Sequence, residues 1–204
     1  MKYLIGEKLK FDWKVVFVTI VSTLLMMTDR YHDLFATKYW DRFFLYLIIP
    51  LILIFVVFRE NPREYGFSFG EWKLGLIFTL LGILLMTPII YFLGHGNTSM
   101  QQYYQRFILG LPWTTFLDLF GWEFLFRGWI LFTYARKFGP EALWLQAVPF
   151  ALAHIGKPEV ETLSTIFGGF AFGWIAWRTK SFLYPFLIHW FIGVLIILVA
   201  AGVV

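Results

Sequence analysis

The chain has 204 residues, of which 59% are hydrophobic and 22% aromatic, while only 15% are charged. Soluble domains are about 45–50% apolar and about 25% charged, so this composition argues against a soluble globular protein. The net charge of +4 is modest and its basic residues stand in short clusters between apolar runs, which argues against nucleic acid as a partner; the absence of cysteine excludes disulfides, cysteine-ligated zinc and a thiol nucleophile.

Seven apolar runs follow one another along the chain. A membrane-spanning helix needs about 20 mostly apolar residues, and the runs are read as such helices. The fifth run is short and is predicted to be tilted, re-entrant or extended through Glu141. The sequence therefore predicts an all-α fold, a polytopic transmembrane bundle of about seven helices (six to eight) in one membrane domain over 1–204. The runs lie at 15–27, 40–58, 74–93, 113–134, 143–154, 161–177 and 182–203.

Lysine and arginine residues flank the apolar runs unevenly. With a cytoplasmic N-terminus and seven spans, eleven of them fall inside and five outside. Because cytoplasmic segments carry an excess of Lys and Arg, the bias predicts a multi-pass protein of the cell membrane with its N-terminus in the cytoplasm. The inside set is Lys2, Lys8, Lys10, Lys14, Arg59, Arg63, Lys73, Arg136, Lys137, Arg178 and Lys180; the outside set is Arg30, Lys38, Arg42, Arg106 and Lys157.

Glu123 and Arg127 are charged residues inside an apolar run. A charge at membrane depth costs about 2.5–3.5 kcal/mol on insertion scales, so it needs a partner or a function. The two residues are four apart and share one face of a helix, where they can pair. Two interpretations stay open: a structural ion pair between helices, and a buried carboxylate that Arg127 orients. Asp118 lies off that face and is predicted to make a separate polar contact near the helix start.

A second polar group ends the fifth run and begins the sixth. His154 closes the fifth run, and Phe150, one turn earlier, is placed to pack against the imidazole. Pro158 is positioned to begin a helix, and Glu159 and Glu161 fall in its first turn, where the helix dipole favours carboxylates. A structural histidine and a helix N-terminus explain this stretch, but Glu161 also borders the apolar face and can reach inward.

His189 lies in the middle of the last run with no charged neighbour in the sequence, so its partner must come from another helix. Together with Glu123, Arg127 and His154 it predicts a buried polar site. A Glu and a His can share a water that attacks a carbonyl, and a second His can stabilise the oxyanion that develops. A metal ion held by two His and two Glu is the alternative, although the chain has no His-Glu-x-x-His pair.

Three short patterns stand in order in the second half of the chain: WEFLFRG at 122–128, FALAH at 150–154, and an intramembrane His189. They resemble the CAAX-protease and bacteriocin-processing family of intramembrane glutamic proteases, also called CPBP or Abi. That family carries Glu-Glu-x-x-x-Arg, then Phe-x-x-x-His, then a His followed a turn later by Asn or Asp. The resemblance covers about 113–203 and implies a helical bundle with an intramembrane polar cavity, made of N-terminal helices at 1–111 and a catalytic core at 112–204.

Two positions depart from the family pattern. Trp122 replaces the first Glu of the pair, which is usually assigned the water-activating carboxylate, and Gly193 replaces the Asn or Asp after the last His. The Trp–Glu form, with a His-x-Gly-Lys-Pro-x-x-Glu stretch from His154 to Glu161, resembles a subgroup of bacterial members. The resemblance therefore implies a divergent subgroup in which Glu123 takes over the missing role, helped by Glu161.

The resemblance implies an intramembrane endopeptidase that cleaves a membrane-associated peptide or protein substrate with water activated by Glu and His. Membrane lipids are the other expected partner; no cofactor is expected, and metal dependence stays open. The departures leave an alternative, a catalytically inactive CPBP-like scaffold or immunity protein. A transporter with a proton relay ranks last, because the two halves of the chain show no repeat. The implied catalytic residues are Glu123, His154, His189 and Glu161, supported by Arg127, Lys157 and Phe150.

Overall fold

The structure is a computed structural model that describes residues 9–204. This part of the chain is helical, and an isolated bridge between Ile155 and Lys157 is its only β-type pairing. The predicted all-α fold is confirmed. Lys2 and Lys8, which the charge bias counts, lie outside the described residues.

Each of the seven predicted runs forms a helix. Two of the helices contain π-helical turns without a break in the helix, one over Lys38–Phe58 and one over α7, η5 and α8. Within 9–204 the elements are α2 (Trp13–Tyr31), α3 (Lys38–Phe43), η1 (Phe44–Ile48), α4 (Ile49–Leu53), η2 (Ile54–Phe58), η3 (Pro62–Tyr65), α5 (Trp72–Gly96), α6 (Thr98–Tyr104), η4 (Gln105–Phe107), α7 (Trp113–Glu123), η5 (Phe124–Ile130), α8 (Leu131–Phe138), η6 (Gly139–Glu141), α9 (Ala142–Leu152), α10 (Glu159–Thr179) and α11 (Leu183–Ala200).

Three of the described helices are long and apolar enough to cross a membrane by length and composition: Lys38–Phe58, α5 and α11. On α5 the side chains of Leu80, Leu84 and Phe92 are 67%, 73% and 74% exposed. Large apolar side chains exposed along a whole helix are unfavourable in water and favourable in lipid, so α5 presents a lipid-facing surface. The chain is therefore a helical membrane protein.

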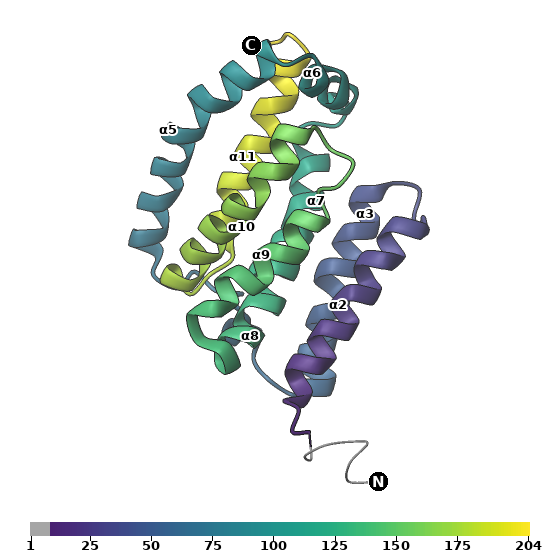
Figure 1. The fold of residues 1–204 in the computed structure, drawn as a ribbon, viewed down its shortest axis with the longest axis vertical. Helices are drawn as coiled ribbons and strands as arrows, with labels where there is room; N and C mark the ends of the chain where they lie inside the picture. The colour runs from purple at the N-terminus through teal and green to yellow at the C-terminus, as the bar shows by residue number, and fades with distance from the viewer. Residues whose placement is uncertain (1–8) are drawn as a thin grey trace.

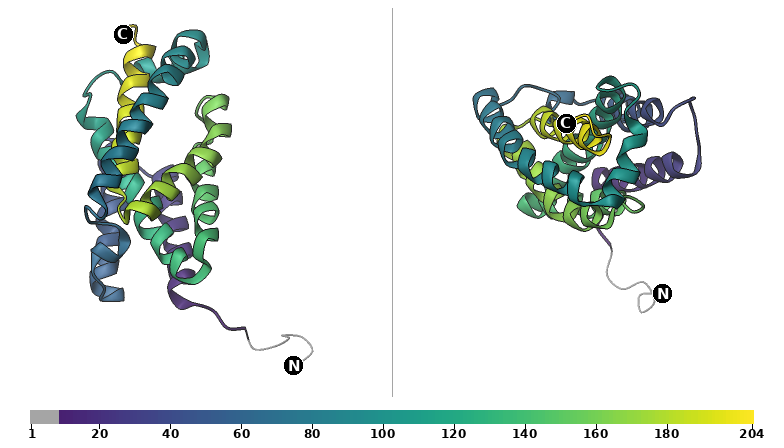
Figure 2. Two further views of the ribbon diagram at one scale, coloured as in Figure 1. Left: turned by 90° about the vertical axis from the view of Figure 1, so that its left-hand side faces the viewer. Right: turned by 90° about the horizontal axis from the view of Figure 1, so that it is seen from above.

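The helices form a bundle in which α7 and α11 are central. Figure 1 shows α5 on one side, α2 and α3 on the other, and α7 to α11 between them. Helix α11 packs against both α5 and α7, and α7 also packs against α3. The short helix α6 lies at the end of the bundle where α11 ends, as the side view in Figure 2 also shows. Polar residues on α7 and α11 are thereby brought together inside the bundle.

Helices α9 and α10 approach each other closely at small residues. A Cβ added at Gly169 would meet Ala147 Cβ at 3.0 Å and Phe150 Cδ1 at 3.1 Å. The side chain of Gln146 crosses the same contact and donates a hydrogen bond to the Gly169 carbonyl at 2.8 Å. Gly169 and Gly173 form a small-xxx-small pair that allows this close approach, and the contact fixes α9, which carries Phe150, against α10.

Candidate active site

Glu123 is the centre of a buried polar cluster. It ends α7 with no exposed surface, and Arg127, one turn later, is also fully buried. Glu123 Oε1 lies 2.6 Å from His189 Nδ1 of α11, and Glu123 Oε2 lies 3.3 Å from Arg127 Nε. The partner from another helix that the sequence predicts for His189 is thus Glu123, and the cluster ties α7 to α11.

The helix changes its winding at this cluster. The seven residues that follow Glu123, Phe124–Ile130, form the π-helical turn η5, and all seven side chains are buried. Such turns are rare and occur frequently at functional sites. Arg127 lies within the turn, so its contact with Glu123 is made across altered helix geometry.

Arg127 lies between a carboxylate and two aromatic faces. Its guanidinium carbon is 3.8 Å from the ring centre of Phe150 and 5.3 Å from that of Phe172. The negative faces of aromatic rings attract a cation, and the attraction is strongest where water is excluded. Glu123 and these rings offset part of the cost of burying the guanidinium, whose three nitrogens make no hydrogen bond within residues 9–204. Arg127 is therefore positioned to hold Glu123 in place by charge attraction.

His154 is held in one tautomer by the backbone. It is 1% exposed just after α9, and its Nδ1 lies 2.7 Å from the carbonyl oxygen of Phe150. A carbonyl oxygen only accepts hydrogen bonds, so Nδ1 carries the proton and Nε2 of the neutral ring carries a lone pair. The ring of Phe150 packs against the imidazole at 4.5 Å between centres, as predicted.

Both histidines line one cavity of about 230 Å³, which we call the histidine cavity. The cavity is also lined by Trp122 and Asp118 of α7, by Arg42 of α3, and by Lys157 from the turn before α10. Two further cations, Arg30 and Arg106, also line the cavity. Glu123 and Arg127 lie behind this wall, because neither side chain is exposed.

Trp122 occupies the cavity wall at the position of the missing Glu. Its ring meets His154 edge to face at 5.6 Å, and Arg42 lies over its face at 5.1 Å. The side chain is 5% exposed. An apolar ring therefore stands where the family pattern places a carboxylate next to the histidine.

Glu161 lies at the edge of the site. Pro158 precedes α10, and Glu159 and Glu161 fall in its first turn as predicted. Glu161 accepts hydrogen bonds from Lys157 at 2.9 Å and from the hydroxyl of Tyr104 at 2.5 Å. Burial and the neighbouring Glu161 carboxylate raise the pKa of Tyr104 well above its usual value, so the phenol stays a donor. Both oxygens of Glu161 are thus engaged outside the cavity wall.

The site residues do not gather in the pattern of a metal centre. Among residues 9–204, no group of three or more His, Asp or Glu side chains is arranged to hold a metal ion. Glu123 contacts His189, whereas Glu161 is held by Lys157 and Tyr104.

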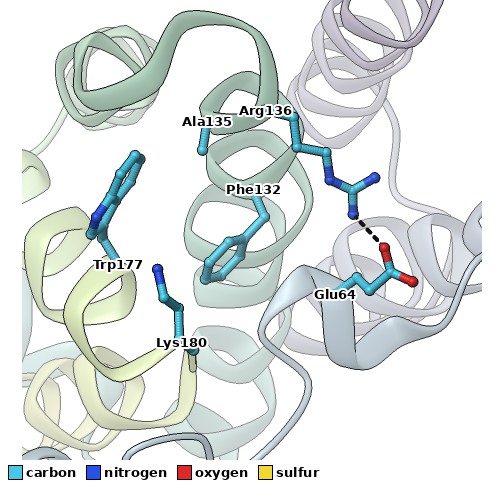
Figure 3. A pocket seen from close by; sticks show the side chains of 6 residues that line it. All are labelled: Glu64, Phe132, Ala135, Arg136, Trp177 and Lys180. Atoms are coloured by element: carbon cyan, nitrogen blue, oxygen red, sulfur yellow. Dashed lines mark hydrogen bonds and ion pairs between the residues drawn. The ribbon is translucent and has the colours of Figure 1, made fainter.

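A second cavity, of about 410 Å³, lies at the other end of α10 and contains none of the predicted site residues. Figure 3 shows Trp177 and Lys180 facing Phe132, with Arg136 paired to Glu64 at 3.3 Å beside them. Histidine is not among its lining residues, so the candidate active site is the histidine cavity.

Asp118 and Arg42 are the site residues that sequence reasoning missed. Asp118 does make a separate polar contact, with Arg42 NH1 at 3.1 and 3.2 Å, but it also lines the histidine cavity. The spacing along the chain could have revealed Asp118. It lies four residues before Trp122, and therefore on the same helix face as the position where the family pattern has its first Glu. The basic residue that meets it comes from α3, which spacing along the chain does not predict.

Comparison with known proteins finds one family that resembles the part of the chain containing this site. Residues 104–195 match the family described as type II CAAX prenyl endopeptidase Rce1-like. The matched region covers a little under half of the chain and includes Glu123, His154 and His189 of the buried site. Neither a curated protein nor a solved structure matches the chain. Over residues 104–195 the chain is thus similar to the Rce1-like family of CAAX prenyl endopeptidases, and the similarity covers the residues that form the buried site.

Proposed function

We propose that the protein is an intramembrane endopeptidase that hydrolyses a peptide bond in the histidine cavity. The observation that carries the proposal is the pair of histidines from different parts of the chain that line this one cavity. Each has its Nδ1 engaged, His154 by a backbone carbonyl and His189 by Glu123. Nε2 of each ring is therefore the nitrogen left for water or substrate.

The proposed reaction follows from these two nitrogens. His154 Nε2 accepts a proton from water as the water oxygen adds to the carbonyl carbon of the scissile bond. His189, when doubly protonated, donates from Nε2 to the oxyanion of the tetrahedral intermediate, while Glu123 balances the charge at Nδ1. His154 then gives its proton to the leaving nitrogen, and the products are a carboxylate and an amine.

Glu123 has a supporting role in this scheme. Both of its oxygens are engaged, by His189 and Arg127, and it has no exposed surface from which to reach a substrate. A carboxylate behind a histidine fixes the orientation of the ring and stabilises its charged form during the reaction. We therefore assign Glu123 to His189, and Arg127 to Glu123.

The proposed substrate is a membrane-associated peptide or protein in the cell membrane. The lipid-facing surface of α5 and the apolar helices around the site favour a substrate that arrives through the bilayer or from its surface. The family description adds prenylated tails as one class of substrate, and bacteriocin leaders and C-terminal sorting helices are further classes. No cofactor is needed in this scheme.

An inactive scaffold or immunity protein is the second candidate, and one observation favours it. Trp122 fills the wall beside His154 where the family pattern has its water-activating carboxylate. If no other group replaces that carboxylate, the cavity keeps the family architecture without its chemistry.

The test is a comparison of protein termini in membranes of cells that produce the wild type or His154→Ala. If the protein is an endopeptidase, we expect new N- and C-termini on at least one membrane protein in cells that produce the wild type. We expect no new termini in cells that produce His154→Ala at the same level. Glu159→Gln is the matched control, because Glu159 is exposed at the start of the same helix as Glu161 and has no place in the scheme. Identical termini in the wild type and His154→Ala would contradict catalysis and support the scaffold.

A further inference from the structure

Carboxylates are scarce on the wall of the histidine cavity. Glu123 is buried behind the wall with both oxygens engaged, and Glu161 is held by Lys157 and Tyr104. Trp122 has replaced the carboxylate that the family pattern places there. Among residues 9–204, Asp118 is the only acidic residue that lines the cavity.

The position of Asp118 is one helical turn from the lost carboxylate. It precedes Trp122 by four residues on α7, so the two side chains share a face about 6 Å apart along the helix axis. Trp122 contacts His154 and lines the cavity with His189. A carboxylate has thus been retained on the cavity face of α7, displaced by one turn.

Asp118 is held by a network that reaches outside the cavity. Arg42 NH1 donates to both of its oxygens, at 3.1 and 3.2 Å. Arg42 is fixed in turn by Asp29, whose Oδ2 lies 3.1 Å from Arg42 Nε and accepts a hydrogen bond from Tyr46 at 3.0 Å. The Asp118 side chain nevertheless keeps 27% of its surface exposed. Arg42 thus fixes the orientation of the Asp118 carboxylate and leaves part of it accessible from the cavity.

We propose that Asp118 is a further catalytic residue, which binds the attacking water and orients it toward the scissile carbonyl. A carboxylate offers about four acceptor sites, and the two hydrogen bonds from Arg42 leave room for a water to donate one of its hydrogens. The other hydrogen goes to His154 Nε2 as the oxygen attacks. Asp118 stays ionised throughout, so one proton moves from water to His154 and then to the leaving amine. This inference rests on the proposed function.

The experiment measures turnover in proteoliposomes with an internally quenched peptide that spans the cleavage site mapped by the terminus comparison. Asp118→Asn keeps the shape and one of the two oxygens that accept from Arg42, but it binds water less strongly. The expected loss in kcat is about 10²–10⁴-fold, with the thermal unfolding midpoint close to that of the wild type. Asp29→Asn loosens Arg42 but does not line the cavity, so its loss is expected to be smaller than that of Asp118→Asn and measures the part that acts through Arg42. Asp33→Asn is the control: Asp33 is an exposed carboxylate that pairs with Lys38 and does not line the cavity, so this variant is expected to keep the wild-type rate.

A relocation variant separates catalysis from structure. Trp122→Glu in the Asp118→Asn background returns a carboxylate to the same helix face one turn away, and it is expected to restore measurable turnover. Asp118→Asn with the wild-type rate would overturn the inference while leaving the proposed function intact. An equal loss in Asp29→Asn with no rescue would also overturn it, because Asp118 would then act only through structure. A wild type that cleaves nothing would overturn the proposed function itself.

Discussion

At the scale of single residues, the buried charges divide into a pair that is enclosed and a pair that faces the cavity. Glu123 and Arg127 have no exposed surface, whereas Asp118 and Arg42 are both partly exposed. Burial in a low-dielectric interior costs each charge its hydration, and removing one partner leaves the other charge buried without compensation. The enclosed pair, Glu123 and Arg127, is therefore suited to fix the orientation of His189. The open pair, Asp118 and Arg42, is suited to bind a water molecule.

Removal of the Glu123 charge tests the enclosed pair. Glu123→Gln leaves Arg127 buried with three aromatic rings as its remaining partners. Loss of one partner of a buried pair costs about 3–5 kcal/mol. We expect a lower thermal unfolding midpoint in detergent as well as lost turnover. Glu159→Gln, at an exposed position, serves as the control and should change neither. A Glu123→Gln protein as stable as the wild type would show that Arg127 is not stabilised by this carboxylate.

The sequence predicted the enclosed pair but not the open one, for a physical reason. Glu123 and Arg127 are neighbours on one helix, so their spacing reveals their contact. Asp118 meets Arg42 across 76 residues of chain, and only the packing of α3 on α7 brings them together. The same holds for His189, whose need for a partner was predicted while the identity of that partner came from the fold.

At the scale of elements, the seven helices were predictable because a long apolar run has few alternatives in a bilayer. Their π-helical turns were not, because no residue type marks such a turn: η5 contains Gly128 and aromatic residues that fit an α-helix as well. Close approach of another helix to α10 was predictable from the spacing of Gly169 and Gly173, since small residues allow it, whereas the identity of that helix, α9, came from the fold.

Two adjacent glycines on α10 offer an internal comparison of that contact. A Cβ at Gly169 would press on Ala147 and Phe150, whereas a Cβ at Gly168 meets nothing within 4 Å. Gly169→Ala is expected to cost about 1–3 kcal/mol of folding stability through overpacking. Gly168→Ala is expected to be neutral or to stabilise the helix by about 0.5–1 kcal/mol. Unfolding in detergent measures both, and equal effects of the two substitutions would contradict a close contact at Gly169.

Glu60 joins three elements after the helix that ends at Phe58. Burial opposes its ionisation, but hydrogen bonds from Lys14 of α2, Tyr65 of η3 and Arg136 of α8 prevail and lower the pKa of Glu60 to about 2. A carboxyl with a lowered pKa contributes stability that is complete above its unfolded value of about 4.5. That contribution is lost as the pH falls from about 4.5 to about 2.

The pH dependence of unfolding tests this junction. We expect the wild type to lose stability in detergent across that window, and Glu60→Gln to be less stable at neutral pH with a flatter pH dependence. Glu71→Gln, an exposed carboxylate at the start of α5, should keep the wild-type slope. An unchanged slope in Glu60→Gln would show that other carboxylates cause the acid sensitivity.

At the scale of the whole molecule, the two ends of the bundle differ. The histidine cavity lies at the end that carries α6, and the junction of Glu60 with Arg136 lies at the other end, where α2 begins. If the N-terminus is cytoplasmic, as the charge bias predicts, the cavity opens toward the outside of the cell. A membrane-associated substrate would then be cleaved on the extracellular side of the membrane.

The absence of cysteine makes this orientation simple to measure. A membrane-impermeant maleimide should label Ser99→Cys, in α6, in intact cells, and should label Lys137→Cys, at the end of α8, only after the membrane is opened. Both positions are exposed, so access to the two sides of the membrane is what the comparison reports. Labelling of Lys137→Cys in intact cells would reverse the orientation and place the cavity on the cytoplasmic side.

Hydrolysis by a water bound in the histidine cavity is tested most directly with isotopic water. Purified protein in proteoliposomes is incubated with its mapped substrate peptide in water enriched in ¹⁸O, and the masses of the products are measured by mass spectrometry. We predict one ¹⁸O atom in the new carboxylate of the wild-type product, and no product from His154→Ala or His189→Ala in the same time. Equal cleavage by the wild type and both histidine variants would contradict an active site in this cavity.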